Sequence, residues 1–329
     1  MKKSSVLWTI VICLLLIFAK IFMGTSFLVA VVIAGTPLLF ATLGELITER
    51  AGNLNLGVEG MMLIGAVAGF GAGFITKNPI MAIIGAVIAG ALAALIYGFL
   101  TITLRANQVV SGLALTIFGT GLSSYLGTNF IGQKMPENVI AFYDPIQIPL
   151  LSKIPVIGQV FFVQDIFVYF GYIMAIVLGI YLFHTKTGLN LRAVGENPSA
   201  ADASGININL YKYVHILIGG ALCGLGGAYL AVVEVPQWQE NITAGRGWIA
   251  IALVIFCKWN PYKATIGAYL FGGLSIIGFR LQHLNISQNL LDMLPYLITI
   301  IVLVISSMKK SKENSPPKGL SVPYFREER

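Results

Sequence analysis

Charge is what this chain of 329 residues has least of. Only 11% of its residues are Asp, Glu, Lys or Arg, whereas 57% are hydrophobic and the mean hydropathy is +0.83. In a soluble globular domain, about a quarter of all residues are charged. The shortage excludes a soluble enzyme domain, a disordered chain and a conventional nucleic-acid binder. The sequence is therefore that of a membrane protein.

Cysteine and catalytic motifs are also scarce. The chain contains no CxxC pair, no cluster of His, Cys and carboxylates at metal-ligand spacing, no GxSxG and no GxxxxGK[ST] loop. It is therefore not expected to be an enzyme, to hold a metal or cofactor, or to bind ATP itself. Three cysteines lie in apolar runs and are expected to be buried apolar residues: Cys13, Cys223 and Cys257. His215 stands alone on an apolar helix face and is expected to be a packing histidine.

Long apolar runs are what the sequence does have. A helix that crosses the bilayer needs about 20 apolar residues. Continuous runs of this kind predict helices, because membrane strands alternate polar and apolar residues instead. We therefore predict an all-α polytopic membrane protein with about ten transmembrane helices. The predicted segments are 6–23, 27–43, 57–75, 80–104, 109–130, 165–184, 213–233, 247–257, 262–281 and 290–307.

Basic residues predict the orientation. If Lys2 and Lys3 are cytoplasmic, 15 of the 21 Lys and Arg residues fall inside and 6 outside, which obeys the positive-inside rule and accounts for the net charge of +7. Lys20 stands where a signal-peptide cleavage site would lie, so the first helix is expected to be uncleaved. Both termini are then cytoplasmic. We predict one transmembrane domain over 1–308, with an external loop at 131–164, and a disordered cytoplasmic tail over 309–329.

The order of the segments indicates an inverted repeat of segments 2–5 and 7–10. Transporters built this way place the substrate path where corresponding segments are short or interrupted by glycine. Two such places are residues 48–60 and 240–248. The following segment, 247–257, would span about 16 Å, roughly half of the hydrocarbon core. Either the chain dips into the membrane before it, or residues 238–245 lie at the interface and the segment is longer.

Polar residues in these places allow two interpretations. Glu59 either stabilises the start of its helix through the macrodipole or lines a path that binds hydroxyl and amine donors. The amides of Asn53, Asn55, Asn107 and Gln108 either bind a hydroxyl-rich solute or serve as helix caps and contacts between helices. Three charged residues at the inner end of the second segment are expected to be exposed or locally paired: Glu45, Glu49 and Arg50.

The sequence of residues 192–205, in a cytoplasmic loop, predicts a short helix. Asn197 suits the N-cap, Pro198 the first helical position and Gly205 the C-terminal cap. Two turns of helix are not stable alone, so another part of the assembly must hold them, unless the helix is only a surface connector.

Three blocks of sequence carry a resemblance to a known family. They are GELITERAGNLNLGVEGMMLIGA at 44–66, TGLNLRAVGENPSAADASGIN at 187–207 and TAGRGWIAIALVIFCKWNP at 243–261. The chain resembles the permease subunit of bacterial ABC importers for simple sugars, nucleosides and branched-chain amino acids. The forms ERAGxxNLGVEGMM and IPLLSKIPVIG are most similar to the nucleoside branch.

The resemblance implies an ATP-driven importer of nucleosides in the bacterial cytoplasmic membrane. Its short cytoplasmic helix would be the coupling helix, which docks on a separate ATPase subunit that binds ATP. The other expected partners are a second, different permease chain, an external substrate-binding protein or lipoprotein, the solute and membrane lipid, with no nucleic acid. The expected coupling residues are Gly195, Glu196, Asn197, Pro198, Ala200, Ala201, Asp202 and Gly205.

The resemblance and the repeat together suggest the residues that line the path. These candidates are Asn53, Asn55, Gly57, Glu59, Asn107, Gln108, Thr243, Arg246 and Trp248. An importer of ribose or another simple sugar is the alternative within the same class. An ion-coupled secondary transporter and a structural subunit of a membrane complex are alternatives of other classes. Co-purification with an ATPase distinguishes the importer from both.

Overall fold

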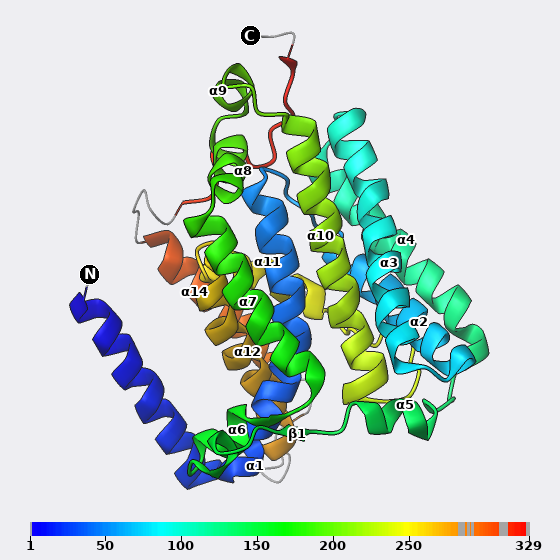
Figure 1. Ribbon diagram of the computed structural model, residues 1–329, viewed down its shortest axis with the longest axis vertical. Helices are drawn as coiled ribbons and strands as arrows, with labels where there is room; N and C mark the ends of the chain where they lie inside the picture. The colour runs from blue at the N-terminus through cyan, green and yellow to red at the C-terminus, as the bar shows by residue number, and fades with distance from the viewer. Residues whose placement is uncertain (1, 282–286, 288–289, 291–292, 309–314, 327–329) are drawn as a thin grey trace.

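The chain forms a bundle of helices with small elements at both ends (Figure 1). The computed structural model describes residues 2–281, 287, 290, 293–308 and 315–326. The α-helices are α1 (Lys2–Arg50), α2 (Val58–Thr76), α3 (Pro79–Gly98), α4 (Gln108–Gly127), α5 (Glu137–Phe142), α6 (Ile157–Phe161), α7 (Ile166–His184), α8 (Lys186–Glu196), α9 (Pro198–Ala203), α10 (Ile208–Tyr229), α11 (Arg246–Phe256), α12 (Pro261–Leu281) and α14 (Leu294–Met308).

Short irregular elements extend or connect these helices. The π-helices η1 (Phe99–Thr103) and η4 (Leu230–Glu234) continue α3 and α10, and η2 (Thr128–Phe130) and η3 (Leu151–Lys153) are 3₁₀ turns. Two strands, β1 (Ile146–Gln147) and β2 (Val163–Gln164), form an antiparallel pair in the long loop before α7. The loop predicted to be external is thus a structured cap over one end of the bundle rather than an open connection.

Within the described residues, every predicted apolar segment overlaps a helix; residues 291–292 of the last one lie outside them. The first two merge into α1, which bends at Gly24, where φ is +79°. Six helical stretches of the described chain are long and apolar enough to cross a membrane: 24–50, 58–76, 79–103, 108–130, 166–184 and 208–234. Helices α11 and α14 are shorter, with 11 and 15 residues. The chain is therefore an all-α multi-pass membrane protein, and ten spans stay a prediction.

Polar residues fix where the helices begin. Asn107, for example, accepts a hydrogen bond from the Val110 N–H at 3.0 Å, which satisfies a donor that the first turn leaves free. The same arrangement starts helices at both ends of the bundle. The side chains that cap in this way are Asn78, Asn107, Asp165, Thr185, Asn197 and Asn207.

Helix α10 lies at the centre of the bundle and depends on small residues. It packs against α1, α2 and α3. At Gly224 a Cβ atom would overlap the Ala86 carbonyl oxygen of α3, and at Gly227 it would overlap the Met62 carbonyl oxygen of α2. Lipid tails are as apolar as the helix surfaces, so close backbone packing replaces the hydrophobic effect as the force that holds such helices together.

The main contacts between helices have counterparts when each helix is replaced by its equivalent in the other half of the chain. Helix α10 packs on α2 and α3, and α1 packs on α11 and α12 in the same manner. Helix α4 likewise contacts α2, and α14 contacts α11. This correspondence of α1, α2, α3 and α4 with α10, α11, α12 and α14 is the pattern that an inverted repeat predicts.

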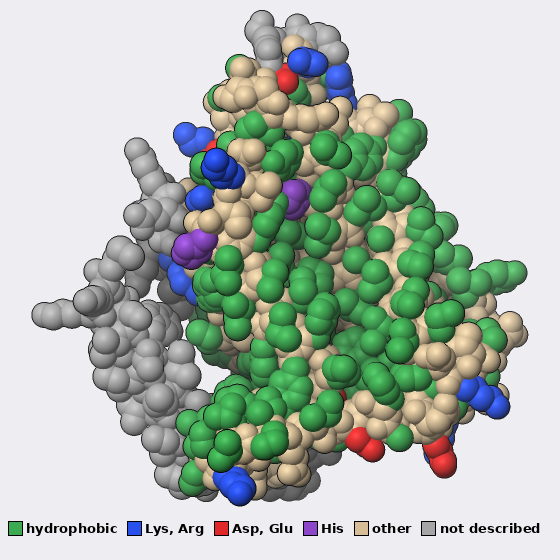
Figure 2. All heavy atoms as spheres, viewed as in Figure 1, with side chains coloured by type: hydrophobic (Ala, Val, Ile, Leu, Met, Phe, Trp, Pro, Cys, Tyr) green, Lys and Arg blue, Asp and Glu red, His purple; other side chains and the backbone are tan. Residues whose placement is uncertain are grey.

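Apolar side chains cover the face seen in Figure 2 between two ends that carry the charged groups. Large apolar residues of α3 and α7 are about half exposed, among them Ile88 at 53%, Leu92 at 55% and Ile176 at 53%. A soluble protein exposes such contiguous surface only where it meets a partner or a membrane. The belt therefore fits a lipid environment.

A buried carboxylate joins the end of the bundle near the long loop to its centre. Asp165 caps α7 by accepting from the Val168 N–H at 3.0 Å, and its second oxygen accepts from the Tyr229 hydroxyl of α10 at 2.9 Å. Burial raises the pKa of Asp165 above its ordinary value, and these hydrogen bonds offset part of that rise.

At the other end of the bundle lie α8, α9 and residues 315–326 (Figure 1). The prediction of a disordered tail differs from the structure for residues 315–326, which contact Gly195, Glu196 and Asp202. Composition favours disorder when a segment buries little apolar surface, but hydrogen bonds to another part of the chain hold this one in place. Residues 309–314 and 327–329 lie outside the described residues.

Candidate functional site

The chain between α1 and α2 is a broken segment buried inside the bundle. Asn53 and Asn55 are 0% and 2% exposed, although neither lies in a helix. The Asn55 side chain accepts from the Gly57 N–H at 2.9 Å, and the Asn55 N–H donates to Glu45 at 2.9 Å. Non-helical backbone at membrane depth needs such partners from the protein.

Further side chains complete the hydrogen bonds of this broken segment. Gln108 accepts from the Leu54 N–H at 2.7 Å, the Tyr97 hydroxyl donates to the Leu54 carbonyl at 2.6 Å, and the Thr116 hydroxyl donates to the Leu56 carbonyl at 2.9 Å. Residues of α3 and α4 therefore hold the segment in place. Tyr97 and Thr116 were not among the sequence candidates, because nothing in their own neighbourhood marks them.

Two of the three charged residues at the end of α1 are buried and the third, Arg50, is half-buried, so the prediction of an exposed or locally paired group is wrong. Glu45 and Glu49 are 0% and 1% exposed. Glu49 accepts from the Trp259 indole N–H, and Arg50 donates two hydrogen bonds to the Trp259 carbonyl at 3.0 and 3.3 Å. Their partners are about 210 residues away in sequence, which is why local reasoning missed them. The end of α1 thus joins the segment before α2 to the turn after α11.

Glu59 lies between the first turns of α2 and α11. One carboxylate oxygen accepts from the Thr243 hydroxyl at 2.5 Å and the Gly245 N–H at 2.8 Å, and the other accepts from the Gly247 N–H at 2.6 Å. Glu59 is 4% exposed and Thr243 is 0% exposed. Two helix N-termini therefore meet around one negative charge, where their dipoles favour it. A Cβ atom on Gly247 would lie 2.5 Å from the Glu59 Cα atom, so this approach requires glycine.

The second interrupted segment matches the prediction of a short helix after a non-helical stretch. Helix α10 ends in the π-helix η4, turns follow over 240–245, and α11 has 11 residues. Arg246 forms an ion pair with Glu234 at 3.2 Å and donates to the Ile242 carbonyl at 3.2 Å. The pair closes the turn before α11.

The structure thus brings together most of the predicted path residues but not all of them. Asn53, Asn55, Gly57, Glu59, Gln108 and Thr243 lie buried around the two interrupted segments, which we call the polar junction. Trp248 is 38% exposed, and Asn107 is exposed and caps α4. For Asn107 the helix-cap interpretation is therefore confirmed. Glu59 does stabilise a helix start, as one interpretation predicted. It does so at α11 as well as at its own helix, α2.

Several buried polar atoms of the polar junction lack a hydrogen-bond partner in the protein. They are both side-chain amide atoms of Asn53 and the Gln108 amide nitrogen. Buried polar groups are nearly always satisfied by protein, water or ligand. Water or a solute that donates and accepts hydrogen bonds would satisfy these atoms.

Helix α9 has the predicted cap at each end. Asn197 accepts from the Ala200 N–H at 3.1 Å, Pro198 occupies the first helical position and Gly205 has φ of +82°. The preceding residues Gly195 and Glu196 end α8. Ala201 is 3% exposed and faces a small apolar cluster with Val194 and Ile208. The opposite side presents small exposed residues: Ser199, Ala200, Ala203 and Ser204.

Comparison with known proteins identifies the family. Residues 27–303 match the family model described as the permease component of the branched-chain amino acid transport system. The chain belongs to this permease family. The prediction of a transport subunit rather than an enzyme agrees with that description.

Individual permeases of the family are similar over most of the chain. NupC of Lactococcus lactis, a nucleoside ABC transporter permease, is 38% identical over 83% of this chain and 89% of its own length. NupQ of Bacillus subtilis, a guanosine ABC transporter permease, is 35% identical over 91% and 96%. TsgC13 of Haloferax volcanii, for which a role as a glucose ABC transporter permease is proposed, is 36% identical over 91% and 97%.

The remaining candidates of this permease are structural. His215 contacts the Tyr181 hydroxyl at 2.7 Å and the Tyr211 carbonyl at 2.6 Å, which confirms a packing histidine. Cys223 and Cys257 are buried and free, as predicted, and the side chain of Cys13 lies outside the described residues. Among the described residues, no three His, Cys, Asp or Glu side chains form a group that could hold a metal ion.

Proposed function

We propose that this permease carries nucleosides into the cell as the membrane subunit of an ATP-driven importer. The observation that carries the proposal is its similarity, over more than four fifths of the chain, to two permeases named for nucleoside and guanosine transport. A nucleoside offers hydroxyl, amine and carbonyl groups. The unpartnered amides of Asn53 and Gln108 can donate to and accept from such groups.

The polar junction is the proposed substrate path. In an inverted repeat, the corresponding interrupted segments meet near the middle of the bilayer. The contact of Glu59 with Thr243, Gly245 and Gly247 joins these two segments, and the exchange of contacts between the two halves supports the repeat. Glu59 holds the junction together, while Asn53 and Gln108 face the solute.

Helix α9 is the proposed coupling helix. Its exposed face of small side chains suits a groove on a separate ATPase subunit, which binds and hydrolyses ATP. The proposed coupling residues are Gly195, Glu196, Asn197, Pro198, Ala200, Ala201, Asp202 and Gly205; Gly195 and Ala201 are buried and pack beneath the others. Both termini and α9 would then be cytoplasmic, in the cytoplasmic membrane of a bacterium.

The complete importer would contain further subunits. We expect a second permease of different sequence, two ATPase subunits and an external substrate-binding protein or lipoprotein. The half-exposed apolar faces of α3 and α7 are available to lipid or to the second permease.

A sugar importer is the second candidate. It is favoured by the 36% identity to TsgC13. The polar junction recognises hydroxyl groups in either case, so the permease alone separates these substrates poorly. An ion-coupled transporter would need no ATPase.

Uptake by the host organism tests the proposal. We would delete the gene and measure entry of labelled adenosine, guanosine, uridine, cytidine, ribose and glucose, with and without the restored gene. Loss of nucleoside uptake that unlabelled nucleosides compete, and that depends on ATP rather than on the proton gradient, is the expected result. Loss of sugar uptake alone would show that the substrate is a sugar and leave the proposal of an ATP-driven importer intact. Uptake driven by the proton gradient would overturn that proposal.

A further inference from the structure

Residues 318–326 cross the junction of α8 and α9, and we call this segment the strap. The Gly319 N–H donates to the Gly195 carbonyl at 2.8 Å, and the Lys318 N–H donates to the Glu196 carboxylate at 3.4 Å. Gly195 itself lies against the end of α1, where a Cβ atom would overlap the Arg50 carbonyl oxygen. The strap therefore begins where α8 meets the main bundle.

The strap then binds the last turn of α9 through Asp202. The Tyr324 hydroxyl donates to the Asp202 carboxylate at 2.6 Å, and the Arg326 guanidinium forms an ion pair with the same oxygen at 3.2 Å. A carboxylate near a helix C-terminus is opposed by the helix dipole. The Tyr324 hydroxyl and the Arg326 positive charge from the strap offset this unfavourable interaction of the carboxylate with the dipole. The Asp202 side chain is 12% exposed, so its contact with Tyr324 is largely shielded from water.

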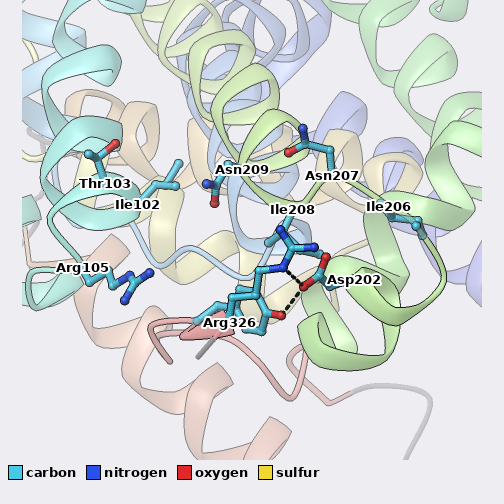
Figure 3. A pocket seen from close by; sticks show the side chains of 11 residues that line it. Ile102, Thr103, Arg105, Asp202, Ile206, Asn207, Ile208, Asn209 and Arg326 are labelled. Atoms are coloured by element: carbon cyan, nitrogen blue, oxygen red, sulfur yellow. Dashed lines mark hydrogen bonds and ion pairs between the residues drawn. The ribbon is translucent and has the colours of Figure 1, made fainter. Parts of the chain in front are cut away.

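The other end of the strap reaches the turn between η1 and α4. The guanidinium of Arg105 lies over the Phe325 ring, 4.7 Å from its centroid. A cavity of about 600 Å³ lies between this turn and α9. In Figure 3 Arg105 lines it from the η1 side, and Asp202 and Arg326 line it from the opposite side.

This turn leads directly to the polar junction. Gln108 is three residues after Arg105 and accepts from the Leu54 N–H inside the broken segment. A continuous set of contacts thus runs from Asp202 through the strap and Arg105 to Leu54. Helix α9, with only six residues, is too short to hold its own position.

We propose that the strap positions the coupling helix and gives it a second connection to the substrate path, with Tyr324 and Arg326 as the positioning residues. The inference rests on the proposed function, because it needs an ATPase that docks on α9. Force applied to α9 reaches α1 and α10 through α8 and the loop before α10. The strap adds the route to α4 and the segment before α2. Without it, ATP hydrolysis is less tightly linked to transport.

The test compares two variants that each remove one hydroxyl. Tyr324→Phe removes the contact with Asp202, whereas Tyr125→Phe alters a side chain of α4 that is 77% exposed and distant in sequence from α9. The full chain would be purified from its host together with its ATPase subunit. Hydrogen exchange of the amides of residues 199–204, affinity for the ATPase, and solute transported per ATP hydrolysed would be measured in lipid nanodiscs.

For Tyr324→Phe we expect amide exchange in α9 to rise about tenfold and ATPase affinity to fall about tenfold, as the loss of a hydrogen bond to a charged group predicts. Solute transported per ATP should fall, while Tyr125→Phe matches the wild type. Arg326→Lys should retain more coupling than Arg326→Ala because it keeps the charge. A merely structural tail would lower the melting temperature without changing transport per ATP.

Two outcomes separate the inference from the function on which it rests. If Tyr324→Phe and the wild type show equal exchange, ATPase affinity and coupling, the strap proposal is overturned and the importer stands. If the wild-type chain retains no ATPase under any condition, the proposed function and the strap fall together.

Discussion

The polar junction and the cytoplasmic end use the same chemistry in different surroundings. In both, a carboxylate from one segment joins it to another segment that is remote in the sequence. Glu59 is 4% exposed and accepts three hydrogen bonds, all inside the bundle. Asp202 accepts from Tyr324 and forms an ion pair with Arg326, whose side chain is 72% exposed.

The difference in exposure determines how strongly the contacts of Glu59 and Asp202 hold their segments together. Water cannot replace the partners of a buried carboxylate, so each lost bond leaves a desolvated group. At the cytoplasmic end, water competes for the exposed Arg326 and ions screen its charge, whereas the contact of Tyr324 with Asp202 is largely shielded. The junction is therefore a fixed point of the permease, and the cytoplasmic end, held by fewer hydrogen bonds, can be displaced at a lower free-energy cost. A rigid junction and a displaceable cytoplasmic end suit a transporter that must move α9 while keeping its substrate path intact.

The largest effect is expected at Glu59. Glu59→Ala leaves one hydroxyl and two backbone N–H groups buried without an acceptor, which destabilises the fold by on the order of 3 kcal/mol or more. Glu59→Gln should be intermediate, because its amide keeps one acceptor and adds a donor facing other donors. Folded yield and thermal unfolding in detergent measure the change. Glu240→Ala, at an exposed glutamate before α11, is the control. Equal melting of Glu59→Ala and the wild type would show that the junction is not a fixed point.

A smaller effect is expected from the glycine contacts that surround the junction. In Gly227→Ala the new methyl group overlaps the Met62 carbonyl, and α10 must separate from α2, with a loss of about 1–3 kcal/mol. Gly121→Ala is the control, because its Cβ atom would have nothing within 4 Å. Removing that glycine should leave stability unchanged or raise it by up to about 1 kcal/mol. Thermal unfolding compares them; similar losses in both variants would contradict the packing argument.

At the cytoplasmic end, Asn197→Ala removes the cap of α9. The loss of about 1 kcal/mol should raise amide exchange in α9 about fivefold and leave the overall melting temperature unchanged. Hydrogen exchange read by mass spectrometry resolves the helix. Ser199→Ala, an exposed residue of the same helix, should not change exchange. If the whole bundle melted earlier in Asn197→Ala, the two regions would not be separable as described.

The smallest change in stability is expected at Asn53, although its effect on transport is larger. Its side-chain amide is fully buried and has no protein partner, so Asn53→Ala removes a desolvated polar group but leaves a small cavity. These opposing effects should change the free energy of unfolding by less than about 1 kcal/mol. Transport should fall about fivefold if one hydrogen bond to the solute, of about 1 kcal/mol, is lost. Asn107→Ala shows the opposite pattern, because it loses a helix cap of about 1 kcal/mol and keeps transport. Normal transport by Asn53→Ala would remove that residue from the path.

Local sequence was sufficient where the physics is local. Apolar runs predicted the helices, since a continuous apolar segment in lipid satisfies its backbone only within itself. Asn197, Pro198 and Gly205 predicted α9, because a cap and a left-handed glycine act within a few residues. The short α11 followed from counting its apolar residues.

Local sequence was insufficient where the partner is remote. Glu45 and Glu49 were expected at an exposed end, and their burial follows from contacts with Asn55 and Trp259. Tyr97 gave no signal of its contact with Leu54. The tail has too few apolar residues to predict order, and the partners that hold it are remote in sequence, such as Asp202, which lies 122 residues before Tyr324.

The order of residues along the chain was enough to predict the long apolar helices, their place in a membrane and the family of permeases that the chain resembles. The packed fold was needed to show which carboxylates are buried, which helix N-termini meet at Glu59, and where the strap lies. The physical reason is the range of the forces involved. Helix formation and lipid partitioning depend on neighbours within a few residues. Satisfying a buried charge depends on whatever the fold brings to it, however far apart the residues lie in the chain.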